Sequence, residues 1–192
     1  MTSISSKSYF IKIQKEICIF KNINNIFTFV GPFGVKSIKV PNKVVVSINK
    51  PSLIEISNVS SKNISKNKFK LFKKHKTIFV GLILQTLSEV LRKSKKKLTL
   101  IGIGYRAEVL KYNSFSILQL KLGFSHHIYI KIPKNLFVFT PKPSKILIFG
   151  SSQQKVDNLA ALIKSYKIPE PYKGKGIFYE NETIALKQGK KI

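Results

Sequence analysis

Residues 31–56 read GPFGVKSIKVPNKVVVSINKPSLIEI, and residues 123–148 read GFSHHIYIKIPKNLFVFTPKPSKILI. When the chain is shifted by 92 positions, these two stretches align without a gap. Gly31 falls on Gly123, Pro41 falls on Pro133, and Lys-Pro-Ser at 50–52 falls on the same tripeptide at 142–144. Turn residues and apolar alternation thus recur in phase, which is typical of one supersecondary unit used twice. The repeat predicts two similar domains, residues 1–95 and 96–192, joined near residues 94–97.

Each copy shows strand patterns followed by a helix pattern. Apolar and polar residues alternate at 38–40 and 130–132 and then meet a proline, as at the end of a strand. Further strands are expected at 54–56 and 146–148, at 27–30 and 117–122, and at 12–19 and 98–103. The last element of each copy is a predicted helix, at 78–91 and at 156–166. The predicted class is α+β, with two tandem duplicated domains, each an antiparallel sheet packed with one main helix.

Particular side chains support these two helices. Leu82, Leu84, Leu87 and Leu91 have helical spacing in the first, as do Leu159, Leu162 and Ile163 in the second. Ser151 and Ser152 are suitable amino-terminal caps for the second helix, and Ile168-Pro169 is expected to end it.

The charge of the chain is strongly positive. Lys and Arg number 35 against 8 Asp and Glu, which gives a formal net charge of +27 and a pI near 10.2. Such an excess predicts a polyanionic partner, either a nucleic acid or an anionic membrane. The apolar fraction of 43% is sufficient for a folded core. The longest apolar run, residues 77–84, is far shorter than the roughly 20 residues that span a bilayer.

No pattern of catalytic or metal-binding residues is apparent. The single cysteine excludes a disulfide scaffold, and Cys18 is expected to be a small core residue. Gly102-Ile103-Gly104 lacks the third glycine and the following helix of a dinucleotide loop. His126 and His127 are neighbours whose side chains should point apart, so no metal site is expected there. We predict no enzyme activity and no cofactor.

Two lysine-rich segments are candidates for contact with a polyanion. Residues 62–76 hold seven lysines and no acid and are interpreted either as a solvated loop or as an extension over phosphates. Residues 169–177 read PEPYKGKGI, where prolines stiffen the chain, glycines permit close approach, and Tyr172 offers a stacking face. This second segment suits a folded RNA backbone, although a glycine-rich exit loop with solvated lysines is the alternative.

The segment 169–177 resembles the signature of the ribosomal large-subunit protein six (L-six) family. Leu100 to Ala107 (LIGIGYRA) is similar to the opening of that family's second domain, and Leu122 to His126 (LGFSH) to its Leu-Gly-Tyr-Ser-His turn. Ala160-Ala161 with Ile163 fits the second helix, and Gly31 to Gly34 resembles the Gly-Pro-Lys-Gly turn of the first domain. The match covers nearly the whole chain, but Phe33, Lys93-Ser94 and His127 depart from the family pattern.

The resemblance implies a structural ribosomal protein that binds large-subunit rRNA near the sarcin–ricin loop and the factor-binding stalk base. Contact would be made mainly by the second domain, while the first domain would act as a spacer against rRNA and neighbouring ribosomal proteins. The family motif implies RNA contacts at Tyr172, Lys173, Gly174, Lys175 and Gly176. Position and charge add Lys155, Lys164, Lys167, Lys187, Lys190 and Lys191.

Other functions are distinguished by what they require. A free-standing RNA chaperone would share the charge but would not need the family motifs, and it remains the alternative. An RNA-recognition-motif protein should show an aromatic, glycine-rich strand, which is missing. A peripheral membrane protein should show an amphipathic helix with a cationic face, whereas the helix predicted at 78–91 has cations only near its end.

The composition also bears on the compartment. Arg92 and Arg106 are the only arginines, and Lys, Ile, Asn, Phe and Tyr are enriched, as in a strongly AT-rich genome. Residues 11–15 resemble an opening that lies about ten residues into bacterial members, which leaves little room for a cleaved presequence. We therefore expect an organelle-encoded protein of the mitochondrial ribosome, with a plastid or an AT-rich bacterium as alternatives.

Overall fold

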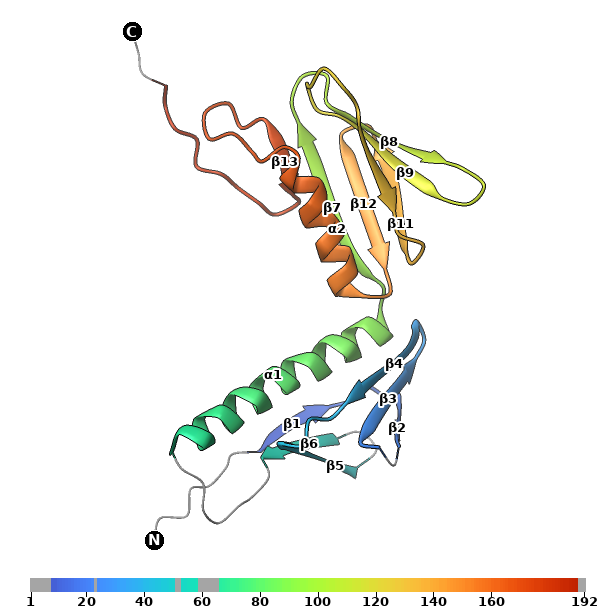
Figure 1. Ribbon diagram of the computed structural model, residues 1–192, viewed down its shortest axis with the longest axis vertical. Coiled ribbons are helices and arrows are strands. Elements are labelled where there is room, and N and C mark those ends of the chain that lie inside the picture. The colour runs from blue at the N-terminus through green and yellow to red at the C-terminus, as the bar shows by residue number, and fades with distance from the viewer. Residues whose placement is uncertain (1–7, 23, 51–52, 59–65, 190–192) are drawn as a thin grey trace. The chain divides into compact units, whose positions relative to one another are not determined.

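The computed structural model describes residues 8–22, 24–50, 53–58 and 66–189 and divides the chain into two compact units. Unit 1 is Met1–Arg92 and unit 2 is Lys93–Ile192. Each unit consists of antiparallel strands and one helix (Figure 1). The predicted α+β class with a repeated sheet-and-helix domain is therefore confirmed. No helix among the described residues is long and apolar enough to cross a membrane.

Unit 1 contains two three-stranded sheets and a long helix. One sheet has the order β1-β6-β5 and the other has the order β2-β3-β4. Helix α1 packs against β3, β4, β5 and β6. The elements are β1 (Tyr9–Lys12), β2 (Cys18–Lys21), β3 (Ile26–Gly31), β4 (Gly34–Lys39), β5 (Val44–Lys50), β6 (Leu53–Asn58) and α1 (Lys66–Leu91).

The core of unit 1 lies between these sheets and α1. Phe29, Ile54 and Ile56 from the strands and Ile83 from the helix are at most 1% exposed. Their alternation along β3 and β6 places one face of each strand inward, as period-two patterning requires. Of the leucines used to predict this helix, Leu87 is buried, whereas Leu82 and Leu84 are exposed on the outer side.

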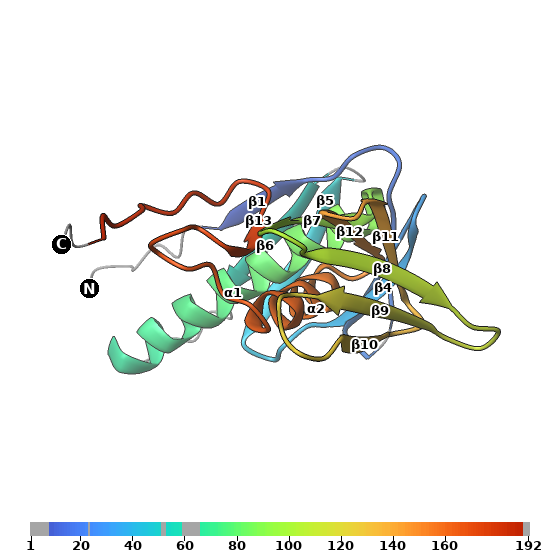
Figure 2. The same ribbon diagram turned by 90° about the horizontal axis from the view of Figure 1, so that it is seen from above.

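Unit 2 has a four-stranded sheet, a second three-stranded sheet and a shorter helix. The first sheet has the order β11-β12-β7-β13, and the second has the order β10-β9-β8. Figure 2 shows β8 and β9 as a long hairpin. The elements are β7 (Ser94–Ile101), β8 (Arg106–Lys111), β9 (Ser116–Lys121), β10 (Ile128–Ile132), β11 (Leu136–Lys142), β12 (Lys145–Gly150), α2 (Gln153–Ser165) and β13 (Gly176–Tyr179).

The repeat is visible in the strand registers. In the β5–β6 hairpin Val46 lies opposite Ile56, and in the β11–β12 hairpin Val138 lies opposite Ile148, which is a shift of 92 residues on both strands. Ile54, Ile56, Ile146 and Ile148 are all fully buried. Earlier in the repeat the shift between equivalent residues changes by one. Ile38 of β4 and Ile130 of β10 are 92 residues apart, but the residues opposite them, Phe27 of β3 and Leu118 of β9, are 91 apart.

Three predictions about unit 1 were wrong. The expected strand at 12–19 is two strands, because Lys15 and Glu16 form a turn between β1 and β2. Cys18, expected in the core, is exposed. The lysine-rich segment expected to be a loop at 62–76 is helical from Lys66 onward, while residues 62–65 lie outside the described part. Lysine is a good helix former, so a segment rich in lysine can be helical.

The connection between the units also differs from the prediction. Residues 94–97, expected at the junction, form the first half of β7 and pair with residues of β12. Helix α1 ends at Leu91, so the connection is short. In unit 2 the helix starts after Ser152, whose backbone is extended, but no side-chain hydrogen bond caps it.

Candidate nucleic-acid interface

The segment between α2 and β13, residues 166–175, is called the C-terminal loop here. Helix α2 is fixed to the sheet by Val156, Leu159, Ala160 and Ile163, all buried. Strand β13 pairs with β7, with Ile177 opposite Leu100. Both ends of the loop are therefore anchored in the core, and Figure 1 shows the loop extending from this end of unit 2.

Backbone hydrogen bonds close the C-terminal loop on itself. The Glu170 N–H donates to the Lys175 carbonyl at 2.9 Å, and the Gly174 N–H donates to the Glu170 carbonyl at 3.0 Å. These bonds put residues 171–173 in a turn at the tip, where Tyr172 is 55% exposed. At the base, the Ile177 N–H donates to the Lys167 carbonyl at 3.0 Å. The loop thus presents Tyr172 and Lys173 from a fixed backbone.

Gly174 in the loop and Gly176 at the start of β13 are both required by the local backbone. Gly174 has φ +63°, a left-handed conformation in which side chains with a branched Cβ are strained. A Cβ on Gly176 would lie 2.5 Å from Cα of Pro169, so the chain can cross there only without a side chain. Gly176 is also buried. The sequence interpretation explained both glycines by close approach of a partner, whereas the structure shows an internal requirement for each.

The chain after β13 returns beside the C-terminal loop. The Lys187 N–H donates to the Pro171 carbonyl at 2.9 Å, and Leu186 approaches the open side of Gly174. This tail adds the exposed Lys187 to the exposed Lys173 and the half-buried Lys175. Four of the predicted RNA-binding residues, Tyr172, Lys173, Lys175 and Lys187, are thereby gathered in one loop-and-tail region. The predicted Lys190 and Lys191 lie outside the described residues.

An ion pair holds the start of the tail against α2. Lys164 Nζ donates to both carboxylate oxygens of Glu182, at 2.5 and 2.6 Å, and lies 4.6 Å from the ring centroid of Tyr179. These Lys164 hydrogen bonds, together with one from the Tyr179 N–H, lower the pKa of Glu182. A second pair, Lys97 with Glu180 at 2.6 Å, joins the tail to β7. Lys164, predicted to bind RNA, is already neutralised by a carboxylate and positions the tail.

Two other predicted lysines lie away from the tip. Lys155 is exposed in the first turn of α2, ten helical residues or about 15 Å from the end of that helix. Lys167 is at the base of the loop, with Nζ 4.7 Å from the ring centroid of Phe124. The structure therefore brings Lys167 near the loop but leaves Lys155 at the opposite end of α2.

An aromatic hollow beside Lys167 was not predicted from the sequence. Phe124, His126, Ile128 and Tyr166 line a hollow of about 300 Å³. The rings of Phe124 and His126 are stacked, with centroids 5.9 Å apart and an interplanar angle of 18°. Half-exposed rings next to a lysine can stack on unpaired bases while the cation contacts a phosphate. The motif at 122–126, which contains Phe124 and His126, could have indicated this hollow, but no contact with RNA was predicted from it.

Metal-ligating groups do not gather in the described part of the chain. Among those residues, no three His, Cys, Asp or Glu side chains are placed to hold a metal ion. His126 stacks on Phe124, and His127 makes an edge contact with Tyr129 at 6.5 Å between centroids. The chemistry that this surface offers is therefore cationic and aromatic contact.

Comparison with known proteins identifies the family. The profile of the family described as "Ribosomal protein L6" matches residues 101–180, which include the C-terminal loop. A protein named "Large ribosomal subunit protein uL6" from Mycoplasma genitalium is 35% identical over 190 residues, covering 99% of this chain and 97% of that protein. The chain belongs to the L-six family of ribosomal proteins. The resemblance found in the sequence motifs is thereby confirmed.

Two further members of the L-six family show where similarity is concentrated. A uL6 protein of Chloroherpeton thalassium is 38% identical over 160 residues, 83% of each chain. One from Vesicomyosocius okutanii is 52% identical over 97 residues, 50% of this chain and 51% of that protein. Identity is thus higher when about half of the chain is aligned, and the family profile lies within unit 2. These relatives are bacterial.

Proposed function

We propose that this protein is a structural component of the large ribosomal subunit and binds large-subunit rRNA through the C-terminal loop and tail of unit 2. Membership of the L-six family supports the first part, because its relatives are named as large-subunit proteins. The net charge of +27 supports the second part, since a polyanion must screen it. By the family resemblance, the rRNA contacted lies near the sarcin–ricin loop and the factor-binding stalk base.

The observation that carries the proposal is the arrangement of the loop and tail. Tyr172, Lys173, Lys175 and Lys187 lie together, and within the described residues none of these lysines is paired with a carboxylate. Lysines placed on phosphates release counterions, which supplies affinity without sequence preference. Tyr172 can stack on an exposed base, and Gly174 and Gly176 shape the backbone that presents it.

The remaining predicted residues have supporting roles in this proposal. Lys167 contacts a phosphate beside the aromatic hollow, and Lys164 positions the tail through Glu182. Lys155 makes a separate phosphate contact, and Lys190 and Lys191 extend the cationic tail. Unit 1 acts mainly as a spacer against rRNA and neighbouring ribosomal proteins, and the protein acts without enzymatic chemistry.

The proposal is tested by RNA binding across a salt series. The probe is a large-subunit rRNA fragment that contains the sarcin–ricin region, and the variant is Lys173→Ala with Lys175→Ala. Each lost phosphate contact should lower the slope of log K against log salt by about 0.7 to 0.9. The matched control is Lys95→Ala with Lys134→Ala, two exposed lysines at the other end of the unit 2 strands. The control pair should leave the slope nearly unchanged.

Two outcomes would contradict the proposed site. Equal losses in the loop pair and the control pair would mean that binding follows total charge alone. Equal binding of the wild type to an unrelated RNA, without sedimentation with ribosomal subunits, would favour a free-standing RNA chaperone. Gly174→Val is not a suitable test, because its φ of +63° would strain the loop even without RNA.

We further propose that the ribosome concerned is mitochondrial. The support is the AT-rich composition, in which Lys almost completely replaces Arg. The relatives named above are bacterial, and the alternatives to a mitochondrion are an AT-rich bacterium and a plastid. Cell fractionation followed by immunodetection decides among them, since recovery from any ribosome other than the mitochondrial one would contradict this part.

A further inference from the structure

Helix α1 has two halves that face different surroundings. From Phe79 to Val90 its inner side is buried in the core of unit 1. The preceding residues, from Lys66 to Thr77, contain six of the chain's lysines and no acid. Lys76 is buried with Nζ 5.0 Å from the ring centroid of Tyr9, so it belongs to the packing of unit 1.

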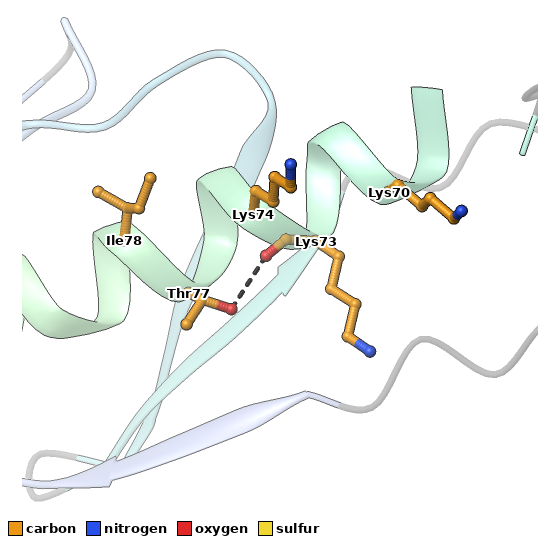
Figure 3. A pocket seen from close by; sticks show the side chains of 5 residues that line it. All are labelled: Lys70, Lys73, Lys74, Thr77 and Ile78. Carbon is orange, nitrogen blue, oxygen red and sulfur yellow. Dashed lines mark hydrogen bonds between the residues drawn. The ribbon is translucent and has the colours of Figure 1, made fainter. Parts of the chain in front are cut away.

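Three lysines of this first half form an open cationic surface, called the lysine face here. Lys70, Lys73 and Lys74 are exposed and follow the i, i+3, i+4 spacing that places side chains on one side of a helix. With Thr77 and Ile78 they line a shallow hollow of about 480 Å³. Figure 3 shows their amino groups pointing in different directions away from the helix. The Thr77 hydroxyl donates to the Lys73 carbonyl at 3.0 Å, so it does not compete for an anion.

Nothing in the described part of unit 1 neutralises the lysine face. The first acid of α1 is Glu89, which is buried near the other end of the helix and bonded to Lys36 at 3.2 Å. Within the described residues, no carboxylate is paired with Lys70, Lys73 or Lys74. Like charges at i, i+3 and i, i+4 repel. An external anion would relieve this repulsion.

A second cationic group lies beside the lysine face. Lys43 Nζ lies 3.3 Å from Nε2 of His75, the residue that follows Lys74. Lys39 and Lys43, together with His75, line a separate hollow of about 480 Å³ on the strand side of the helix. Cations thus continue from α1 onto the β4–β5 connection, as they would along an extended polyanion.

We propose that the lysine face of α1 is a second contact for an RNA phosphate backbone, separate from the C-terminal loop. Lysine meets phosphate as a point charge, and the face has no exposed ring on which a base can stack, so contact would be independent of sequence. A membrane is a poorer occupant, because the main apolar side of α1 is already covered by the strands. The outer side also exposes Leu71, Ile78, Leu82 and Leu84, so vesicle binding is the competing outcome of the test below. This inference rests on the proposed function and gives unit 1 an RNA contact of its own.

The primary test is hydrogen exchange on the full chain with and without large-subunit rRNA. Bound RNA should slow amide exchange in residues 66–77 as well as in residues 170–176. Protection of 170–176 alone would overturn the lysine face and leave the proposed function standing. Protection of 66–77 alone would overturn the proposed loop and support the lysine face. The readout needs no substitution, so loss of folding cannot obscure it.

A second test uses matched lysine pairs. Lys70→Gln with Lys74→Gln keeps good helix formers and should lower the salt slope of RNA binding by about 1.4 to 1.8, the value for two phosphates. Lys12→Gln with Lys15→Gln removes the same charge from exposed positions of unit 1 and should change the slope little. Equal effects of the two pairs would overturn the inference. So would unchanged RNA binding combined with lost binding to phosphatidylserine vesicles, which would assign the face to a membrane.

Discussion

The β5–β6 hairpin of unit 1 and the β11–β12 hairpin of unit 2 pair equivalent residues, Val46 with Ile56 and Val138 with Ile148. Outside these hairpins the units diverge. Helix α1 has 26 residues and α2 has 13, and unit 2 continues into the C-terminal loop, β13 and the tail. The shared hairpins bury apolar side chains on one face, although Lys142 and Lys145 of β11–β12 are exposed. The C-terminal loop, the tail and the first half of α1, which carry the proposed RNA contacts, lie outside the shared hairpins.

The largest expected effect tests whether the two cores are equivalent. Ile54 and Ile146 are both fully buried at corresponding positions. Ile54→Ala and Ile146→Ala should each lower the free energy of unfolding of its own unit by about 2 to 5 kcal/mol, through lost burial and the cavity left behind. Hydrogen exchange of β5–β6 and β11–β12 amides measures this. A loss below about 1 kcal/mol at one position only would contradict the equivalence.

A smaller effect is expected at the aromatic residue of the C-terminal loop. Tyr172→Ala should weaken rRNA binding by about 1 to 3 kcal/mol if the ring stacks on a base. Tyr112 is the matched control, because it is 54% exposed, close to the 55% of Tyr172, and lies at the end of the β8–β9 hairpin. Equilibrium titration with the sarcin–ricin fragment compares the two. Equal losses of binding affinity in the two variants would mean that Tyr172 contributes no more to rRNA binding than an exposed tyrosine elsewhere in unit 2.

The ion pair in unit 2 should produce a modest pH dependence. The pKa of Glu182 is lowered by Lys164, so its stabilising contribution is fully present above the unfolded value near 4.5 and is lost as pH falls through the lowered pKa of the folded state. Glu182→Gln should therefore destabilise unit 2 at pH 7, by about 1 kcal/mol for a partly exposed pair, and the difference from the wild type should shrink as the pH is lowered toward 2. Urea denaturation across a pH series from 7 to 2 measures this. A difference that stays constant over the series would mean that the carboxylate charge is not involved.

The smallest expected effect concerns Lys155. Because Lys155 lies about 15 Å from the end of α2, it should act independently of the C-terminal loop. Lys155→Ala should lower the slope of log K against log salt by at most about 0.7 to 0.9, the value for one phosphate contact. Its effect should be additive with that of Lys173→Ala. A double-mutant cycle in the salt series measures this. Strong coupling between the two positions would contradict their separation.

The sequence predicted the parts of the fold that have local signals. Alternation and proline placement identified the strands around Ile38 and Ile130, and the offset of 92 identified the equivalent hairpins. The turn at Lys15 and Glu16 has no glycine or proline, so two strands were read as one. The first half of α1 lacks a regular apolar stripe, and its lysines were taken as a sign of a loop although lysine favours helices.

The candidate interface was predictable only where a motif marks it. The motif at 169–177 pointed to Tyr172 and Lys173, which the structure places at the tip of the loop. The partners of other lysines are distant in sequence, so no local pattern could reveal them. Lys164 meets Glu182 across 18 residues, and Lys167 meets the ring of Phe124 from another part of unit 2. Such contacts depend on the folded sheet and on where the tail returns.

The most direct test of the central claim is sedimentation with large ribosomal subunits that have been depleted of their own L-six protein. Wild-type protein should sediment with these subunits at moderate salt, as should Lys95→Ala with Lys134→Ala. Lys173→Ala with Lys175→Ala should be released at a lower salt concentration than either. Absence of wild-type protein from the subunits, or release of all three proteins at the same salt concentration, would contradict the claim that the C-terminal loop holds this protein on ribosomal RNA.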